Sequence, residues 1–234
     1  MPTATDKISE AIEKLRRLTR LNIQGDWGFW EGDLAIAPLQ ELDCWSIAKL
    51  NERGHIAWSS GQQVLWLRQR IVVPHNLHGY PLDGLCLRVG LTWWAQAASI
   101  FVNGELVQAG DLFDSSARIL LKQAAIPGEE IILALRLVSP GHDAGALMRS
   151  LLLWESADPT CLDPGFVADE LETWHNLIRV KNSQDLRTNI LLSSFAVVKG
   201  KNLDSLIELI DWDALADKAK FERSLFAFRQ SLLV

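Results

Sequence analysis

The chain has little cysteine and few basic residues. Its three cysteines in 234 residues, Cys44, Cys86 and Cys161, lie far apart and form no C-x-x-C pair. Such an odd, scattered set provides neither a disulfide framework nor a zinc-ligand pattern, and it favours a reducing, cytoplasmic setting. Lysine and arginine number 23 against 29 aspartate and glutamate residues, which gives a formal net charge of −6. This balance argues against a nucleic-acid partner, which would need a basic face.

Long apolar runs are also missing. No stretch approaches 18 consecutive apolar residues, and the first 20 residues carry charges at short intervals instead of an apolar segment. We therefore expect neither a membrane span nor a secretory signal. A hydrophobic fraction of 48% with 22% charged residues is typical of an ordinary globular protein.

Tryptophan is abundant, with ten residues against a single tyrosine. Its ring fills cores well and also serves as a platform on which sugars stack. Trp93 and Trp94 are adjacent, and neighbours on a strand point to opposite faces, so both cannot face the core. One of them is expected to meet solvent, a loop or a partner. Stacking on a sugar is one use for it, and packing beneath the N-terminal helix is the other.

Alternating apolar residues predict strands through most of residues 62–154. Residues 64–73 place Leu65, Leu67 and Ile71 on one face, and Asn103-Gly104 is a strong hairpin signal between two short strands. Glycine and proline turns separate the strands and no helix intervenes, which predicts antiparallel sheets. The expected fold is mainly β, a jelly-roll β-sandwich.

Helical periodicity marks both ends of the chain. One helix is expected near the N-terminus, one after the capping pair Asp163-Pro164, and others over about 183–198, 203–210 and 213–234. The predicted organisation is an N-terminal helix (1–22), a β-sandwich domain (23–158) and a helical connector (159–234).

The last of these helices carries many apolar side chains in its closing turns. They are Leu225, Phe226, Phe228, Leu232, Leu233 and Val234. A helix of this kind requires a covering surface. Self-association into a homodimer, docking on the sandwich, or a following domain absent from this chain would each provide one.

Two loops carry candidate chemical groups. Residues 139–145 hold His142 and Asp143 at a strand end, where they offer an imidazole and a carboxylate, or else form a turn capped by the aspartate. His75 and His78 lie three apart in a turn, where they could seat a metal or simply be solvated. The sequence has no G-x-S-x-G, H-E-x-x-H, P-loop or G-x-G-x-x-G motif.

A set of segments carries a resemblance to a known family. The segments are residues 51–58, 61–70, 91–94, 100–107, 110–114, 137–143 and 163–171. Together they resemble the N-terminal region of cyanobacterial-type α-mannosidases of glycoside hydrolase family 38. The tryptophan-bearing strand followed by Val-Asn-Gly is also similar to the galactose-binding-like jelly rolls found beside many glycosidase catalytic domains. The Ser-Pro-Gly-His-Asp loop and the Asp-Pro-Gly-Phe segment point to the narrower assignment.

The resemblance implies that this chain is not itself catalytic. In that family a separate α/β barrel holds a divalent metal, usually zinc, through a His-x-Asp-x-x-Trp motif, and it uses an aspartate nucleophile with retention. The present sequence lacks this motif, and the adjacent His142 and Asp143 cannot replace it. No catalytic residue and no metal ligand is therefore assigned here, and the zinc would belong to an absent catalytic domain.

The expected function is that of a non-catalytic domain of an α-mannosidase, which packs on and supports the catalytic barrel of the same polypeptide. The alternative is a carbohydrate-binding module for mannose-type glycans that uses Trp93, Trp94, His142 and Asp143. A self-contained enzyme is the least favoured hypothesis, because no nucleophile or acid–base pair stands out.

Overall fold

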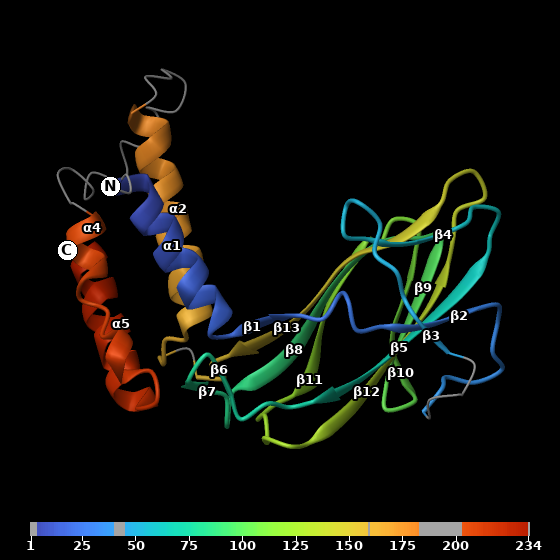
Figure 1. Cartoon of the computed structure of the whole chain (residues 1–234), viewed down its shortest axis with the longest axis horizontal. Helices are drawn as coiled ribbons and strands as arrows, with labels where there is room; N and C mark the ends of the chain where they lie inside the picture. Colours follow the sequence, from blue (N-terminus) through green and yellow to red (C-terminus); the bar gives the residue numbers. More distant parts are fainter. Residues whose placement is uncertain (1–3, 40–44, 159, 183–202, 234) are drawn as a thin grey trace. The chain divides into compact units, whose positions relative to one another are not determined.

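A computed structural model describes residues 4–39, 45–158, 160–182 and 203–233 (Figure 1). The chain divides into two compact units. Residues 1–20, 76–82 and 155–234 form one, here called the helical unit, and residues 21–75 and 83–154 form the other, the sandwich unit. The sequence suggested three consecutive segments instead. The contacts join both ends of the chain, with a short stretch from its middle, in one unit.

The sandwich unit contains two antiparallel sheets. The first has the order β1-β13-β8-β11, with β4 paired to β13, and the second has the order β10-β9-β12-β5-β2-β3. The strands are β1 (Arg20–Asn22), β2 (Gly28–Glu31), β3 (Ser46–Ile47), β4 (Ile56–Trp58), β5 (Val64–Val72), β8 (Cys86–Trp94), β9 (Ala97–Val102), β10 (Glu105–Asp111), β11 (Ser116–Lys122), β12 (Glu130–Val138) and β13 (Gly145–Glu155). The prediction of a mainly antiparallel β-sandwich with an N-terminal helix and C-terminal helices is confirmed.

Strand alternation explains the core of the sandwich unit. On β5, Leu65, Leu67 and Ile71 are buried, and β12 pairs with β5 in register over its whole length. Other fully buried side chains are Val89, Leu91, Ile100, Leu133, Leu135 and Leu147. Each contributes roughly 1.5–3 kcal/mol by leaving water, so the inward faces of the two sheets account for much of the stability of this unit.

The helical unit contains four helices, a short 3-10 turn and a hairpin in the part of the chain that the structure describes. They are α1 (Ala4–Arg17), α2 (Pro164–Asn182), α4 (Leu203–Ile207), η2 (Trp212–Ala214), α5 (Lys218–Leu233), and the hairpin of β6 (Asn76–Leu77) and β7 (Tyr80–Pro81). α5 is the last of these four helices along the chain. The helix expected over 183–198 lies outside the described residues. None of the described helices combines the length and apolar character needed to cross a membrane.

The predicted cap of α2 is present. Asp163 Oδ1 accepts a hydrogen bond from the Phe166 amide at 2.8 Å, which satisfies one of the free N–H groups of the first turn. Farther along, Arg16 of α1 reaches Glu172 at 2.6 Å and Asp169 at 3.0 Å. These ion pairs tie α1 to α2, two helices about 150 positions apart in the sequence.

The apolar side of α5 is covered within the helical unit. Phe221, Leu225 and Phe228 are fully buried, while Phe226 is 48% exposed. The Tyr80 ring meets Phe221 edge-on at 5.8 Å. The sequence offered a second copy, the sandwich or a following domain as the cover of this helix; for these buried residues the cover lies within the helical unit, which also contains α2, α4 and the β6–β7 hairpin. A homodimer stays an untested prediction.

Candidate functional site

A hollow of about 480 Å³ lies in the sandwich unit, and we call it the Trp94 hollow. Its walls come from the turn at 51–55, from β4, from the last residue of β8 and from the start of β13. The lining residues are Asn51, Glu52, Arg53, His55, Ala57, Trp94, Asp143, Ala144, Gly145, Ala146 and Met148. Most of the polar side chains belong to the 51–55 turn.

Local hydrogen bonds fix the two polar walls of the Trp94 hollow. Asn51 Oδ1 accepts the amide hydrogens of Arg53 at 2.9 Å and of His55 at 3.0 Å. This Asx turn holds the backbone while the side chains of the turn remain at the surface. On the other wall, Asp143 Oδ1 accepts the Ala144 amide at 2.8 Å. The capping aspartate expected from the sequence is therefore present, and the same residue lines the hollow.

The tryptophan pair divides between core and surface, as strand alternation requires. Trp93 is 1% exposed and belongs to the core of the sandwich unit, so its assignment as a sugar contact is corrected. Trp94 is half-buried and lines the hollow. His142 is exposed and is not among the lining residues, whereas its neighbour Asp143 is. Of the four candidate residues, the structure thus brings Trp94 and Asp143 together.

The Trp94 hollow has the composition of a site for a polyhydroxylated ligand. A tryptophan ring offers an apolar face for the C–H groups of a sugar. The carboxylates of Glu52 and Asp143 can accept hydrogen bonds and the Arg53 guanidinium can donate them. A sugar hydroxyl can therefore act as donor or as acceptor in this hollow. Sequence reasoning missed the 51–55 turn as part of the site, because its polar residues have no distinctive spacing.

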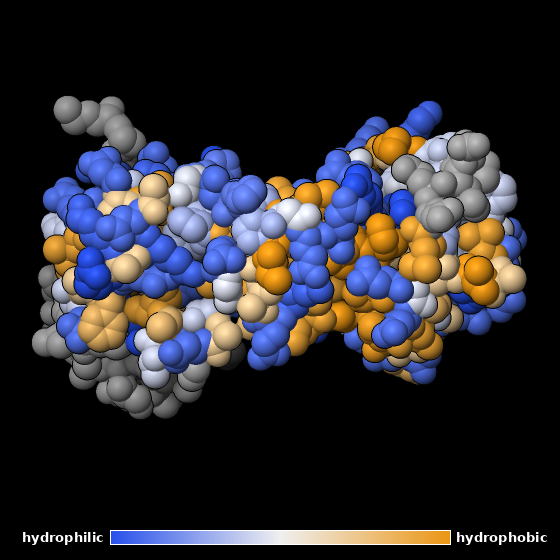
Figure 2. Space-filling view, turned by 90° about the horizontal axis from the view of Figure 1, so that it is seen from below, coloured by the Kyte–Doolittle hydropathy of each residue, from blue (hydrophilic) through white to orange (hydrophobic). Residues whose placement is uncertain are grey.

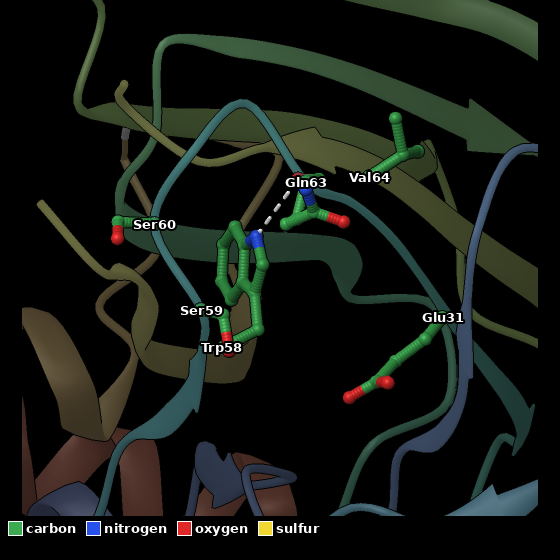
Figure 3. A pocket seen from close by; sticks show the side chains of 6 residues that line it. All are labelled: Glu31, Trp58, Ser59, Ser60, Gln63 and Val64. Carbon is green, nitrogen blue, oxygen red and sulfur yellow. Dashed lines mark hydrogen bonds between the residues drawn. The ribbon is translucent and has the colours of Figure 1, made fainter. Parts of the chain in front are cut away.

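A second hollow, of about 290 Å³, lies in the same unit (Figure 3). We call it the Trp58 hollow, and it is lined by Glu31, Trp58, Ser59, Ser60, Gln63 and Val64. Ala57 lines the first hollow and Trp58 the second. Since adjacent residues of β4 point to opposite faces, the two hollows lie on opposite sides of this strand.

Trp58 is held in place from two directions. Its Nε1 donates a hydrogen bond to the Gln63 carbonyl at 3.1 Å (Figure 3). Gly145 pairs with it across the ladder, and a Cβ built on Gly145 would clash with Cζ2 of the indole. A side chain at position 145 and the observed Trp58 ring therefore exclude each other.

Neither the described histidines nor the described acids suggest a metal centre. No group of three histidine, cysteine, aspartate or glutamate side chains among the described residues is placed to hold an ion. His75 and His78 are both exposed. These residues do not fit the zinc that the resemblance implies for a catalytic domain, and no chemical step through a metal is derived for this chain.

The fold is thus an antiparallel β-sandwich with two hollows beside β4. No protein-family profile matches the sequence, and no curated protein matches it. Among solved structures, a glycoside hydrolase family 2 member from Bacteroides cellulosilyticus is similar over 59% of this chain and 21% of its own length, with 16% identity and a TM-score of 0.47. A β-glucuronidase 2 from Bacteroides uniformis is similar over 58% of this chain and 18% of its own, with 15% identity and a TM-score of 0.45.

A β-glucuronidase from glycoside hydrolase family 2 gives a TM-score of 0.44 at 13% identity, over 60% of this chain and 18% of its own. The chain spans about a fifth of the length of these enzymes. TM-scores below 0.5 mark a loose likeness, and neither an activity nor a substrate of this chain follows from them. No structure named here belongs to family 38, so that assignment stays a prediction from the sequence.

Proposed function

We propose that this chain is a non-catalytic module of a glycoside hydrolase and that its β-sandwich binds a glycan in the Trp94 hollow. One observation carries the proposal. Trp94 and Asp143, both selected from the sequence as sugar contacts, line the same hollow although 49 positions of the chain separate them. The hollow adds the polar side chains of the 51–55 turn to this pair.

The ligand class follows from the chemistry of the lining. An aromatic face beside carboxylates and a guanidinium suits a ring with an apolar face and hydroxyl edges, which describes a pyranose. The sequence resemblance to α-mannosidases favours mannose-type glycans among the pyranosides. It also favours a parent enzyme whose zinc and nucleophile belong to a separate catalytic domain, and the scattered cysteines favour a cytoplasmic location.

Calorimetric titration of the purified chain with mannose and manno-oligosaccharides tests this proposal. We expect saturable heat that Trp94→Ala reduces by about tenfold or more in affinity, with a smaller loss in Asp143→Asn. Asp26→Asn is the matched control, because Asp26 is an exposed acid of the same unit outside both hollows. Absence of heat with every glycan, or unchanged binding by Trp94→Ala, would contradict the proposal.

The non-catalytic part of the proposal has its own test. The chain alone should not hydrolyse an aryl α-mannoside, with or without added zinc. Hydrolysis that a chelator abolishes would show that the chain holds a metal-dependent active site, and the module hypothesis would be wrong.

A second candidate function is a supporting domain that packs on the catalytic barrel of the same polypeptide. Exposed apolar side chains of the sandwich unit favour it: Phe113 is 92% exposed, Ile36 79% and Leu106 57%. Apolar residues gather over this unit in the space-filling view (Figure 2). Surfaces of this kind commonly mark protein contacts. A pure support would give no heat with any glycan, and its separately produced catalytic domain would bind it in sedimentation experiments.

A further inference from the structure

We infer that the Trp58 hollow is a second ligand site, which takes one neutral hexose ring and excludes acidic sugars. This inference does not depend on glycan binding in the Trp94 hollow, because the two hollows share no lining residue. The volume of the Trp58 hollow, about 290 Å³, is at the lower end of the range for small-molecule sites. It therefore suits one sugar ring better than an oligosaccharide.

The acid of this hollow is Glu31, the last residue of β2. Its backbone pairs with Leu65 of β5, and this pairing fixes where the side chain starts. In Figure 3 the carboxylate end of Glu31 is directed toward the side of the hollow formed by Trp58. Glu31 is exposed, and its carboxylate has no ion pair or hydrogen bond among the described residues, so its oxygens are open to a ligand.

The opposite wall is built before any ligand arrives. Gln63 and Ser139 form two hydrogen bonds of 2.9 Å. The backbone N–H of Gln63 donates to Ser139 Oγ, and the backbone N–H of Ser139 donates to the backbone carbonyl of Gln63. The same carbonyl accepts the Trp58 indole N–H. Together with the contact on Gly145, these bonds fix the ring that faces Glu31. A preformed wall lowers the ordering cost of binding.

The charge of the lining selects the ligand class. Among its six residues the one ionisable group is the Glu31 carboxylate, whose oxygens, when ionised, only accept hydrogen bonds. Ser59 and Ser60 add hydroxyls that can donate or accept hydrogen bonds. The side-chain nitrogen of Gln63 is already engaged, because it donates to the Gly61 carbonyl at 3.3 Å. The hollow therefore favours a ligand that donates, such as a pair of sugar hydroxyls. A sugar carboxylate would meet Glu31 without a compensating cation.

Nuclear magnetic resonance of the full chain tests this site directly. The probes are methyl α-mannopyranoside, methyl β-glucopyranoside and glucuronate, and the signal is the indole N–H of Trp58, assigned through its contact with the Gly145 α-protons. We expect a saturable shift with at least one methyl hexoside and none with glucuronate. Glu31→Gln should weaken the apparent affinity by about tenfold, because a charge-assisted hydrogen bond is lost.

Two controls separate this site from the first one. Glu52→Gln removes an acid from the Trp94 hollow, and Trp94→Ala removes its aromatic face; both should leave the Trp58 shift unchanged. The inference is wrong if neither methyl hexoside moves the Trp58 signal, if glucuronate moves it equally, or if Glu31→Gln has no effect. It is also wrong if Trp94→Ala abolishes the shift. Calorimetric binding that Trp94→Ala leaves unchanged, together with an intact Trp58 shift, would contradict only the proposed function.

Discussion

The two units bury their apolar residues to different extents. In the helical unit, Phe221, Leu225 and Phe228 of α5 are fully buried, and few large apolar side chains of its described part are exposed. In the sandwich unit, many are exposed, and Phe113 and Ile36 are almost free of cover. The sandwich unit carries apolar surface beyond what its own fold uses, so we look there for contacts with other molecules.

The units also differ in how the chain builds them. The sandwich unit is built by backbone ladders, many of them between strands far apart in the sequence, such as β12 with β5 and β13 with β4. The helical unit joins three distant segments, and its contacts include the Tyr80 hydroxyl, which donates to Glu222 at 2.9 Å across 142 positions. Ion pairs of Arg16 and Arg20 with Asp169 join the first segment to the last. Side-chain contacts between distant segments, more than backbone ladders, therefore define this unit.

The sharpest test of buried packing in the helical unit is Phe221→Ala. We expect a loss of about 3–5 kcal/mol in the free energy of unfolding, because a fully buried aromatic ring next to Tyr80 and Trp212 leaves a cavity. The measurement is denaturant unfolding followed by the helical circular dichroism signal. Phe226→Ala, on the same helix at a 48% exposed position, should cost under about 0.5 kcal/mol. Equal losses in the two variants would show that α5 is not packed as described.

In the sandwich unit, Gly145→Ala tests the contact that separates the two hollows. The added methyl would meet the Trp58 indole, so either the ring or the start of β13 must move, at a cost of about 1–3 kcal/mol. Gly141→Ala is the matched control, because a Cβ there meets no atom within 4 Å. Thermal unfolding measures the loss, and tryptophan fluorescence reports the displaced ring. A neutral Gly145→Ala variant would argue against this close approach.

The strand pattern and one hairpin could be predicted from the sequence because both are local. Alternation on β5 identified Leu65 and Leu67, and the Asn103-Gly104 turn has the two positive φ angles, 51° and 84°, that this residue pair tolerates. Which segment covers the outer face of a sheet depends on contacts between residues far apart in the sequence, so it could not be predicted in this way. Arg68 of β5 is only 7% exposed, because it donates to the Leu39 carbonyl at 2.8 Å, about 30 positions earlier in the chain.

The distinction between local patterns and distant contacts also applies to the site and to the helical unit. Trp94 could be selected because strand alternation forces one of two adjacent tryptophans outward, and Asp143 because it lies in a glycine-flanked loop. Nothing in the sequence near residues 76–82 indicates that Tyr80 is buried against α5. Its partner Glu222 lies far along the chain, and periodicity carries no information on such a pairing.

Tyr80 allows a test of the helical unit by pH, because it is the single tyrosine of the chain. Burial, with the Glu222 carboxylate beside it, raises the pKa of Tyr80 far above its ordinary value near 10. Because the pKa is raised in the folded state, the contribution of neutral Tyr80 to the free energy of unfolding is full below about pH 10 and is lost as the pH rises further. The absorbance of tyrosinate should therefore appear only on unfolding. Tyr80→Phe should cost about 1 kcal/mol at neutral pH, and tyrosinate forming near pH 10 in the folded chain would contradict this burial.

The smallest expected effect lies at the surface of the sandwich unit, in the pair of Asp33 and Arg136. The guanidinium donates to both carboxylate oxygens, at 2.8 and 2.6 Å, and with the Trp66 indole it lowers the pKa of Asp33 to about 2. A lowered pKa in the folded state means that the contribution is present above about pH 4 and disappears as the pH falls toward 2. Both side chains are partly exposed, so Asp33→Asn should cost less than about 1 kcal/mol at neutral pH. Thermal unfolding of this variant and of Asp26→Asn across this range measures the effect, and a loss in Asp33→Asn that persists at pH 2 would show that the ion pair is not its source.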